Sequence, residues 1–183
     1  MIKFIATCLT DEQERACESL GIEIERNYAG SYGEIAEGCV TDFSVHCFNS
    51  TALEVLAEMG VRRATLHPEL NLAQIRDMRK AIDTEAVIYG RLPLMKLGNV
   101  QVNGAITDRM GVEFWVDGDV VYNSVPIFVA DKLKEVEKAG VTHGRLIFTV
   151  ESYDEARAVI RAYMYRKGMT MAFTRGKFFV KGG

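Results

Sequence analysis

The stretch Val61-Arg-Arg-Ala-Thr-Leu-His-Pro-Glu-Leu-Asn-Leu-Ala-Gln-Ile75 decides the predicted fold, together with Val87-Ile-Tyr-Gly-Arg-Leu-Pro-Leu-Met95. Each begins as a short run with β-branched residues and continues into polar residues, where a strand would meet its loop. In an α/β fold, functional side chains gather at the C-terminal edge of a parallel sheet. The two segments therefore predict strands whose polar ends lie at such an edge.

Strands and helices are expected to alternate through the first half of the chain. The expected strands are residues 2–7, 22–26, 42–49, 61–66 and 85–89, and the expected helices are residues 10–20, 50–60 and 71–82. Thr10 and Asn71 are the expected N-caps of the first and third helices, and Ser50 or Thr51 begins the second. A weak helical turn is expected at residues 32–37. Strands that alternate with helices favour a mainly parallel sheet.

The alternation breaks at residues 96–107, which are rich in Gly and Asn and are expected to form a loop. Next, Val112–Trp115 and Val120–Tyr122 flank Asp117-Gly118-Asp119, which predicts a β-hairpin. The alternation then resumes. A helix is expected at residues 128–139, a strand at 143–150, a helix at 152–166 capped by Ser152, and strands at 169–174 and 177–180.

The length of 183 residues fits one α/β domain, residues 1–183, with an N-terminal β-α-β portion at residues 1–41. A complete (β/α)8 barrel needs ~250 residues. We therefore expect a partial (β/α) barrel-like array with a mainly parallel sheet and an inserted β-hairpin. An unclosed array leaves unpaired strand edges, so we expect a homodimer, or completion of the barrel by a partner subunit.

Charge and composition exclude several classes of function. The net charge of −3 comes from 22 basic and 25 acidic residues and gives no broad field for a nucleic-acid backbone. No apolar run approaches the ~20 residues that span a bilayer, and the N-terminus does not resemble a signal peptide, so a cytoplasmic protein is expected. No metal or cofactor is expected, because the spacing of the cysteines favours reduced thiols over a metal set: Cys8, Cys17, Cys39 and Cys47.

Glu69 is the first candidate for a catalytic carboxylate. Pro68 restricts the turn before it, so Glu69 would sit at the end of a strand. There it could act as general base for an attacking water, or bind a metal or a substrate amine. The structural alternative is that Glu69 favours the N-terminus of the helix starting near Asn71. His67 lies two residues earlier and would share a face with Glu69 on an extended chain. The two form a candidate acid–base pair, and the alternative for His67 is a hydrogen-bonded bystander.

Candidate substrate-binding residues follow the expected strands. Arg91 would recognise a carboxylate, such as a peptide C-terminus or a small acidic ligand, unless it pairs with Glu69 or Glu151. Asp108 and Arg109 precede the expected hairpin and could simply form its turn. The remaining candidates are expected at the same edge as Glu69 if the sheet is parallel: Arg145, Thr149, Glu151 and Arg175.

Several strings resemble the collagenase-like peptidase family U-32 over residues 42–178. They are Phe48-Asn49-Ser50, Leu66-His67-Pro68-Glu69-Leu70, Tyr89-Gly-Arg-Leu-Pro-Leu-Met95, Thr107-Asp-Arg-Met-Gly111, Asn123-Ser124 with Pro126, Arg145-Leu-Ile-Phe-Thr-Val-Glu151 and Phe173-Thr-Arg-Gly176. The resemblance implies a barrel-like domain that hydrolyses unfolded or collagen-like peptides. His67 departs from the family, which commonly has a small residue at that position.

The family also contains hydroxylases of tRNA or ubiquinone precursors, in which four cysteines that begin just after the Pro-Leu-Met string hold an iron–sulfur cluster. Here residues 96–106 contain no cysteine, which disfavours that activity. Three hypotheses remain in order. The first is a U-32-type peptidase, the second is a non-catalytic half-barrel binding or assembly module, and the third is an RNA- or quinone-modifying protein whose partner carries the cluster.

Overall fold

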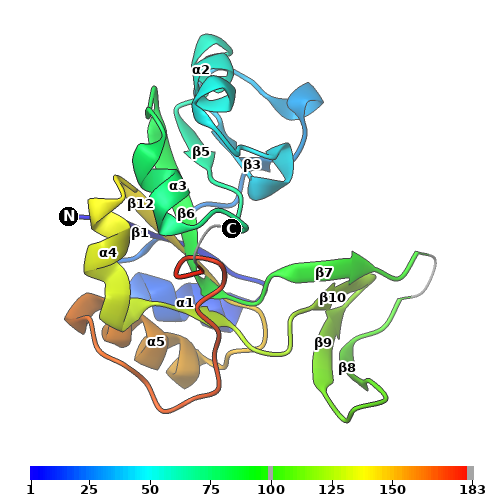
Figure 1. Cartoon of the computed structure of the whole chain (residues 1–183). Coiled ribbons are helices and arrows are strands. Elements are labelled where there is room, and N and C mark those ends of the chain that lie inside the picture. The colour runs from blue at the N-terminus through cyan, green and yellow to red at the C-terminus, as the bar shows by residue number, and fades with distance from the viewer. Residues whose placement is uncertain (99–100, 181–183) are drawn as a thin grey trace.

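The computed structural model describes residues 1–98 and 101–180, and a curled main sheet forms its body (Figure 1). Seven strands of this sheet run parallel in the order β2-β1-β12-β6-β5-β4-β3, and β11 pairs antiparallel with β6. The strands are β1 (Lys3–Thr7), β2 (Glu23–Ile24), β3 (Tyr28–Ala29), β4 (Val40–Thr41), β5 (Arg63–Thr65), β6 (Asp83–Gly90), β11 (Ile127–Phe128) and β12 (His143–Ile147). The prediction of a mainly parallel sheet is confirmed.

Helices connect these strands. They are α1 (Asp11–Ser19), α2 (Ser50–Glu58), α3 (Leu72–Asp77), α4 (Leu133–Lys138) and α5 (Tyr153–Tyr165), with single 3-10 turns η1 (Tyr32–Glu34), η2 (Phe43–Val45) and η3 (Ala130–Lys132). The predicted N-caps Thr10, Asn71 and Ser152 are confirmed, and each forms a capping box with the residue three positions later. The N-termini of these helices could be predicted from the sequence, because an N-cap depends on hydrogen bonds between residues close together in the chain.

The main sheet curls into a half-barrel, as predicted. Its two edges are β2 and β3, and only Glu25–Asn27 lie between them in the chain. Such a link spans at most about 14 Å. Across the hollow, the guanidinium carbon of Arg145 on β12 lies 3.8 Å from the ring centroid of Tyr28 on β3. The homodimer prediction assumed unpaired strand edges on the main sheet. These edges are β2 and β3, which are two residues long each and lie near each other.

The predicted hairpin insertion is confirmed and is larger than expected. Four strands form a separate antiparallel sheet in the order β7-β10-β9-β8, which projects from the body (Figure 1). They are β7 (Pro93–Lys96), β8 (Gly104–Thr107), β9 (Glu113–Asp117) and β10 (Val120–Tyr122). Asp117 pairs with Val120 across a turn in which Gly118 has a φ of +61°. The expected loop at 96–107 was wrong at both ends. Lys96 belongs to β7, which pairs with β10, and residues 104–107 form β8, which pairs with β9, so strand pairing overrides the turn-like composition. Residues 99–100 of the expected loop lie outside the described residues.

The expected strand at 42–49 was also wrong. The ladder stops at Thr41, η2 follows, and His46 adopts a left-handed backbone with a φ of +59°. Ser44 contributes to the departure, because its hydroxyl, which has one hydrogen to donate, lies 2.9 Å from the Gly30 carbonyl oxygen and 3.2 Å from the Asp42 carboxylate. Such local side-chain bonds compete with strand pairing.

Two helix boundaries differ from the expectation. The third helix ends at Asp77 rather than near Ile82, because Met78 has an extended ψ of 137° and the Lys80 ammonium binds the exposed carbonyl of Met78 at 3.0 Å. The expected helix at 128–139 begins later, since Phe128 pairs with Tyr89 as part of β11.

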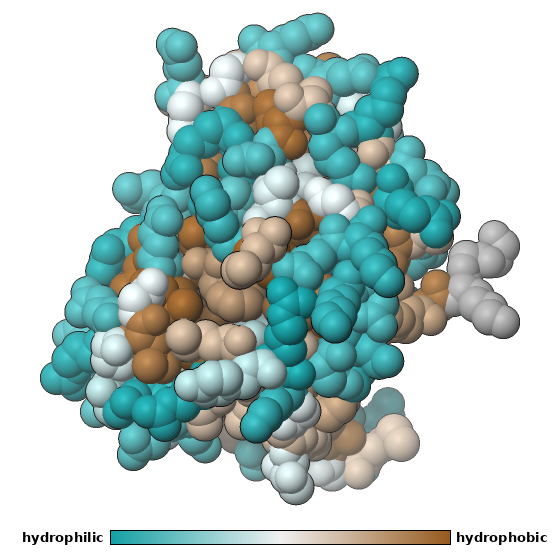
Figure 2. Space-filling view, turned by 90° about the vertical axis from the view of Figure 1, so that its left-hand side faces the viewer, coloured by the Kyte–Doolittle hydropathy of each residue, from teal (hydrophilic) through white to brown (hydrophobic). Residues whose placement is uncertain are grey.

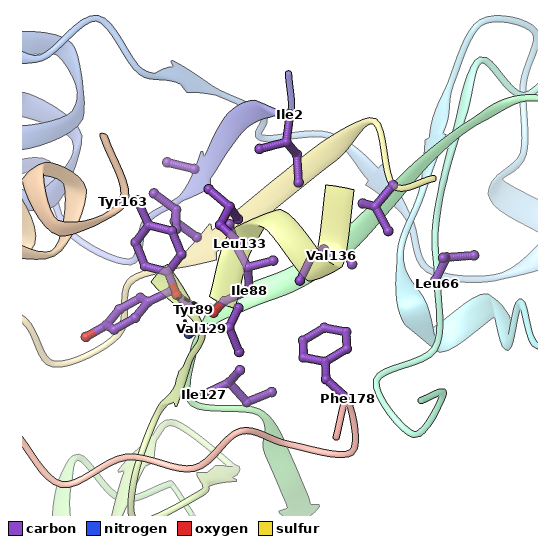
Figure 3. Close-up of a cluster of buried hydrophobic side chains, with 14 of the residues drawn as sticks. Ile2, Leu66, Ile88, Tyr89, Ile127, Val129, Leu133, Val136, Tyr163 and Phe178 are labelled. Atoms are coloured by element: carbon purple, nitrogen blue, oxygen red, sulfur yellow. Dashed lines mark hydrogen bonds between the residues drawn. The ribbon is translucent and has the colours of Figure 1, made fainter. Parts of the chain in front are cut away.

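The expected strands at 169–174 and 177–180 are absent from the described residues. Only Thr174 makes an isolated bridge, to Ile127. Phe178 instead points into the main hydrophobic cluster, which includes Ile127, Val136 and Leu66 (Figure 3). The C-terminal segment therefore contributes to the core by a buried side chain rather than by strand pairing.

The same cluster is held by one buried tyrosine. The Tyr163 hydroxyl accepts the Val129 N–H at 2.9 Å and donates to the Ile88 carbonyl at 2.5 Å (Figure 3). Burial raises the pKa of Tyr163 far above its usual value, so it stays neutral.

On the side that carries α4 and α5, the surface is mixed, with apolar side chains gathered among polar ones (Figure 2).

Candidate active site

Parallel pairing brings the ends of three strands to one edge of the half-barrel. His67 and Glu69 follow β5, Arg91 follows β6, and Thr149 and Glu151 follow β12, as expected. Asp108 and Arg109 do not join them, because they lie in the turn between β8 and β9 on the projecting sheet. Asp108 accepts the N–H groups of Met110 and Val112 at 2.8 and 2.9 Å, so it forms the turn.

His67 is the centre of an aromatic stack at this edge. Its ring lies 4.1 Å from the Phe48 ring and 5.3 Å from the His46 ring, measured between centroids. Its Nδ1 accepts the Glu69 N–H at 3.3 Å. Burial lowers the pKa of His67, and the Glu69 charge opposes that shift. The neutral ring therefore carries its proton on Nε2 and acts as a hydrogen-bond donor rather than as a base.

Glu69 is the available base beside this stack. Its side chain is exposed, and its carboxylate has no hydrogen-bond or ion-pair partner within residues 1–98 and 101–180. The helix-capping role belongs to Asn71, whose side chain accepts the Gln74 N–H at 2.9 Å. Glu69 thus keeps both carboxylate oxygens free for a water or a substrate.

His46 and Phe48 were not among the predicted site residues. Cys47 between them forms a bridge with Leu66, and its carbonyl accepts the His67 N–H at 3.1 Å. That pairing sets the buried Cys47 inward and leaves the exposed side chains of His46 and Phe48 beside His67. The left-handed backbone at His46 is uncommon for a residue other than glycine. No local sequence pattern signals this conformation.

Glu151 is the centre of a second, buried group. One carboxylate oxygen accepts from the Tyr89 hydroxyl at 2.9 Å and from Arg91 Nη1 at 2.8 Å, and the other accepts the Thr149 N–H at 2.7 Å. The alternative that Arg91 pairs with a neighbouring carboxylate is therefore confirmed for Glu151. The Thr149 hydroxyl is buried and has no hydrogen-bond partner among the described residues.

A pocket of about 300 Å³ opens beside Arg91. Met169, Met171 and Val159 supply apolar walls, while Glu151 and Glu155 add carboxylates. Only Nη1 of Arg91 is bonded to a described residue, and the side chain is partly exposed. The other guanidinium nitrogens remain available for a carboxylate ligand.

Arg145 projects into the hollow of the sheet, and its guanidinium reaches the C-terminal ends of β1 and β4. It lies in the middle of β12, where its Nε donates to the Thr7 hydroxyl at 3.0 Å and its Nη1 pairs with Asp42 at 2.5 Å. Its face stacks on the Tyr28 ring. Strand alternation turns Arg145 inward, so its guanidinium lies inside the half-barrel near the C-terminal ends of β1 and β4 and contacts internal partners there.

The hollow holds further polar groups beneath Arg145. Arg63 lies 2.9 Å from Glu85, and Glu85 also accepts from the hydroxyls of Thr65 and Tyr28 at 2.9 and 3.0 Å. Burial raises the pKa of Glu85, and the charges of Arg145 and Arg63 oppose that shift. Paired buried charges of this kind tie strands together across the curl, so this network is structural.

The Arg175 side chain is likewise bound to partners within the protein. It pairs with both oxygens of Asp131 at 2.5 and 2.8 Å and donates to the Phe128 carbonyl at 3.0 Å. These contacts fasten the C-terminal segment to β11 and η3. Its predicted role in binding substrate has no support from this geometry.

The residues do not fit an iron–sulfur cluster. Cys8 and Cys17 lie close together, with 3.7 Å between the sulfurs, but Cys39 and Cys47 do not join them. Among the described residues no three His, Cys, Asp or Glu side chains are placed to hold a metal ion. In the same part of the chain, no helix combines the length and apolar character that a membrane span requires.

Comparison with known proteins gives one match. No curated protein and no solved structure matches the chain. The model described as Peptidase family U32 matches residues 40–113, which run from β4 through β9 and include His67, Glu69 and Arg91. This segment of the chain, less than half of its length, is therefore similar to peptidase family U32.

Proposed function

We propose that this protein is a peptidase that hydrolyses unfolded or collagen-like peptides at the C-terminal edge of its half-barrel. The observation that carries the proposal is the position of the family match. It covers the ends of β4, β5 and β6. There the Glu69 carboxylate, which has no partner among the described residues, lies beside the neutral imidazole of His67.

The two side chains suit complementary steps of amide hydrolysis. Glu69 takes a proton from the attacking water, since its carboxylate has no competing partner among the described residues. His67 donates its Nε2 proton as a hydrogen bond to the carbonyl oxygen as negative charge develops there. The Glu69 N–H on Nδ1 holds the ring in that tautomer. Phe48 and His46 keep the ring in place by stacking.

An extended peptide is the substrate that suits an open edge. Glu69 is exposed rather than enclosed, so a folded loop gains few contacts there, whereas an unfolded strand can lie along the ends of β5 and β6. Arg91 has uncommitted nitrogens at its pocket and would hold an acidic side chain or a peptide C-terminus.

Hydrolysis of denatured collagen and of a mixed peptide library tests the proposal. Glu69→Gln keeps the size of the side chain and removes the base, so we expect cleavage to fall by about 10²–10⁴-fold. Glu58→Gln is the matched control, because Glu58 is also exposed but ends α2, on the far side of the chain from the edge. Equal cleavage by wild type and Glu69→Gln would refute the role of Glu69.

A second candidate function is peptide binding without cleavage, as in an assembly module. The commitment of Arg145 and Arg175 to internal partners favours it, because two of the predicted substrate contacts serve the fold instead. Binding of a library peptide, lost in Arg91→Ala and unaccompanied by cleavage in the folded wild type, would support this alternative over the peptidase.

Self-association and location belong to the same proposal. We propose a homodimer, and light scattering that shows only monomer at micromolar concentration would exclude it. The open edges available to such a dimer are β7 and β8 of the projecting sheet. We propose a cytoplasmic location, which four free cysteines support. RNA or quinone modification would require a partner that supplies the cluster.

A further inference from the structure

Cys8 and Cys17 form a pair that the proposed peptidase function does not use. Cys8 follows β1 and is half-buried, whereas Cys17 lies within α1 and is fully buried. Their sulfurs are 3.7 Å apart. Both thiols are free. The arrangement therefore offers one thiol to solvent and holds a second directly behind it.

We propose that Cys8 and Cys17 are a redox-active dithiol site that closes to a disulfide on reaction with a small-molecule disulfide such as oxidised glutathione. Closure brings the sulfurs from contact to a bond of about 2.05 Å, and the links that hold α1 keep the two residues facing each other. The side chain of Gln13 on α1 donates to the carbonyls of Thr149 and Glu151 at 3.1 and 2.9 Å and fixes the helix against the end of β12.

The chemistry balances in two exchange steps. The Cys8 thiolate attacks one sulfur of oxidised glutathione, which forms a mixed disulfide and releases one glutathione thiolate. The Cys17 thiolate then attacks Cys8 Sγ from behind and displaces the second glutathione. Two electrons pass from the cysteines to the oxidant, and the two cysteine protons end on the two glutathione thiols. Because Cys17 is buried, an external disulfide reaches Cys8 first.

The surroundings support Cys17 as the resolving thiol. The hydrogen-bonding contact with Cys8 lowers the pKa of Cys17, although burial opposes that shift. The same contact, with burial, raises the pKa of Cys8. The two thiols therefore ionise as a pair, and transfer of a proton between the sulfurs in contact lets Cys8 act as the attacking thiolate and Cys17 as the resolving one.

Peptide mapping of the oxidised native protein tests the proposal. The folded chain is incubated with oxidised glutathione in excess, free thiols are blocked with N-ethylmaleimide at low pH, and the chain is digested with trypsin. Cleavage after Arg15 separates the two cysteines into peptides 4–15 and 16–26. We expect these two peptides to be joined, two hydrogen atoms lighter than their sum, and separated again by dithiothreitol.

Variants assign the order of the steps. In Cys17→Ala, which avoids a buried polar group, we expect Cys8 to remain as a stable mixed disulfide with glutathione. Cys39→Ala is the control, because Cys39 is as accessible as Cys8 but has no neighbouring thiol, and it should form the cross-link like wild type. The proposal is overturned if Cys8 and Cys17 are both blocked by maleimide after oxidation, or if the cross-link forms only in urea.

Discussion

Removal of the Glu151 carboxylate should destabilise the protein strongly, because two buried donors depend on it. Glu151→Ala leaves the Tyr89 hydroxyl and the Thr149 N–H without an acceptor, and both residues are at most 5% exposed. Each unsatisfied buried donor costs about 1–3 kcal/mol. Arg91 loses its partner too, but its side chain reaches solvent and adds little. We expect the free energy of unfolding to fall by about 3–5 kcal/mol.

Urea denaturation followed by far-UV circular dichroism measures this change. Glu151→Gln keeps one carbonyl oxygen and should cost about 1–2 kcal/mol, since one donor keeps its acceptor. Glu135→Ala is the control, because Glu135 is exposed and lies 3.8 Å from Lys132, so its loss should cost at most about 0.5 kcal/mol. A loss below about 1 kcal/mol in Glu151→Ala, or equal losses in the Ala and Gln variants, would refute the buried-acceptor argument.

Two further predictions concern stability. The Arg166 guanidinium holds the pKa of Glu137 at about 2, below its ordinary 4.5, so its stabilisation is complete above pH 4.5 and is lost as pH falls toward 2. In Glu137→Gln the urea midpoint should therefore fall less than in wild type as the pH is lowered from 4.5 toward 2. Midpoints of the two proteins that fall in parallel over this range would contradict the prediction. Gly90→Ala should cost about 2–3 kcal/mol, because Gly90 has a φ of +126° and a Cβ there would lie 2.3 Å from the Ile147 carbonyl oxygen. Gly33→Ala, where nothing lies within 4 Å, is its control, and equal urea midpoints for both variants would rule out the clash.

The parts of the fold that the sequence predicts are those set by neighbours in the chain. Thr10, Asn71 and Ser152 begin their helices as expected, because each satisfies N–H groups two or three residues later. Gly118 marks its turn for the same reason, since the backbone there needs a positive φ. The pairing of Arg91 with Glu151 was among the predicted alternatives, because parallel strands such as β6 and β12 place their C-terminal ends at one edge of the sheet.

The parts that the sequence leaves open depend on how far the sheet curls. Arg145 reaches Asp42 across 103 positions of sequence, and no local pattern reports whether such residues face each other. The same curl decides that Tyr28, on the opposite edge strand, lies over the Arg145 guanidinium. His46 is a further case, because the bridge between Cys47 and Leu66 fixes its position.

The distribution of uncommitted atoms separates the functional candidates from the structural ones. Arg145 and Arg175 each bond through two guanidinium nitrogens to internal partners, which leaves fewer donors for a substrate. Arg91 bonds through Nη1 alone, and Glu69 has no partner within the described residues. Both lie inside the matched segment of the family. A buried charge pair resists substitution because it holds the fold, whereas loss of Glu69 should spare stability and reduce activity. Measurement of both stability and peptide cleavage in the Glu69 and Glu151 variants therefore tests the catalytic role. Loss of cleavage without loss of stability in Glu69→Gln would indicate a catalytic edge, whereas a binding surface on the same half-barrel would show no cleavage to lose.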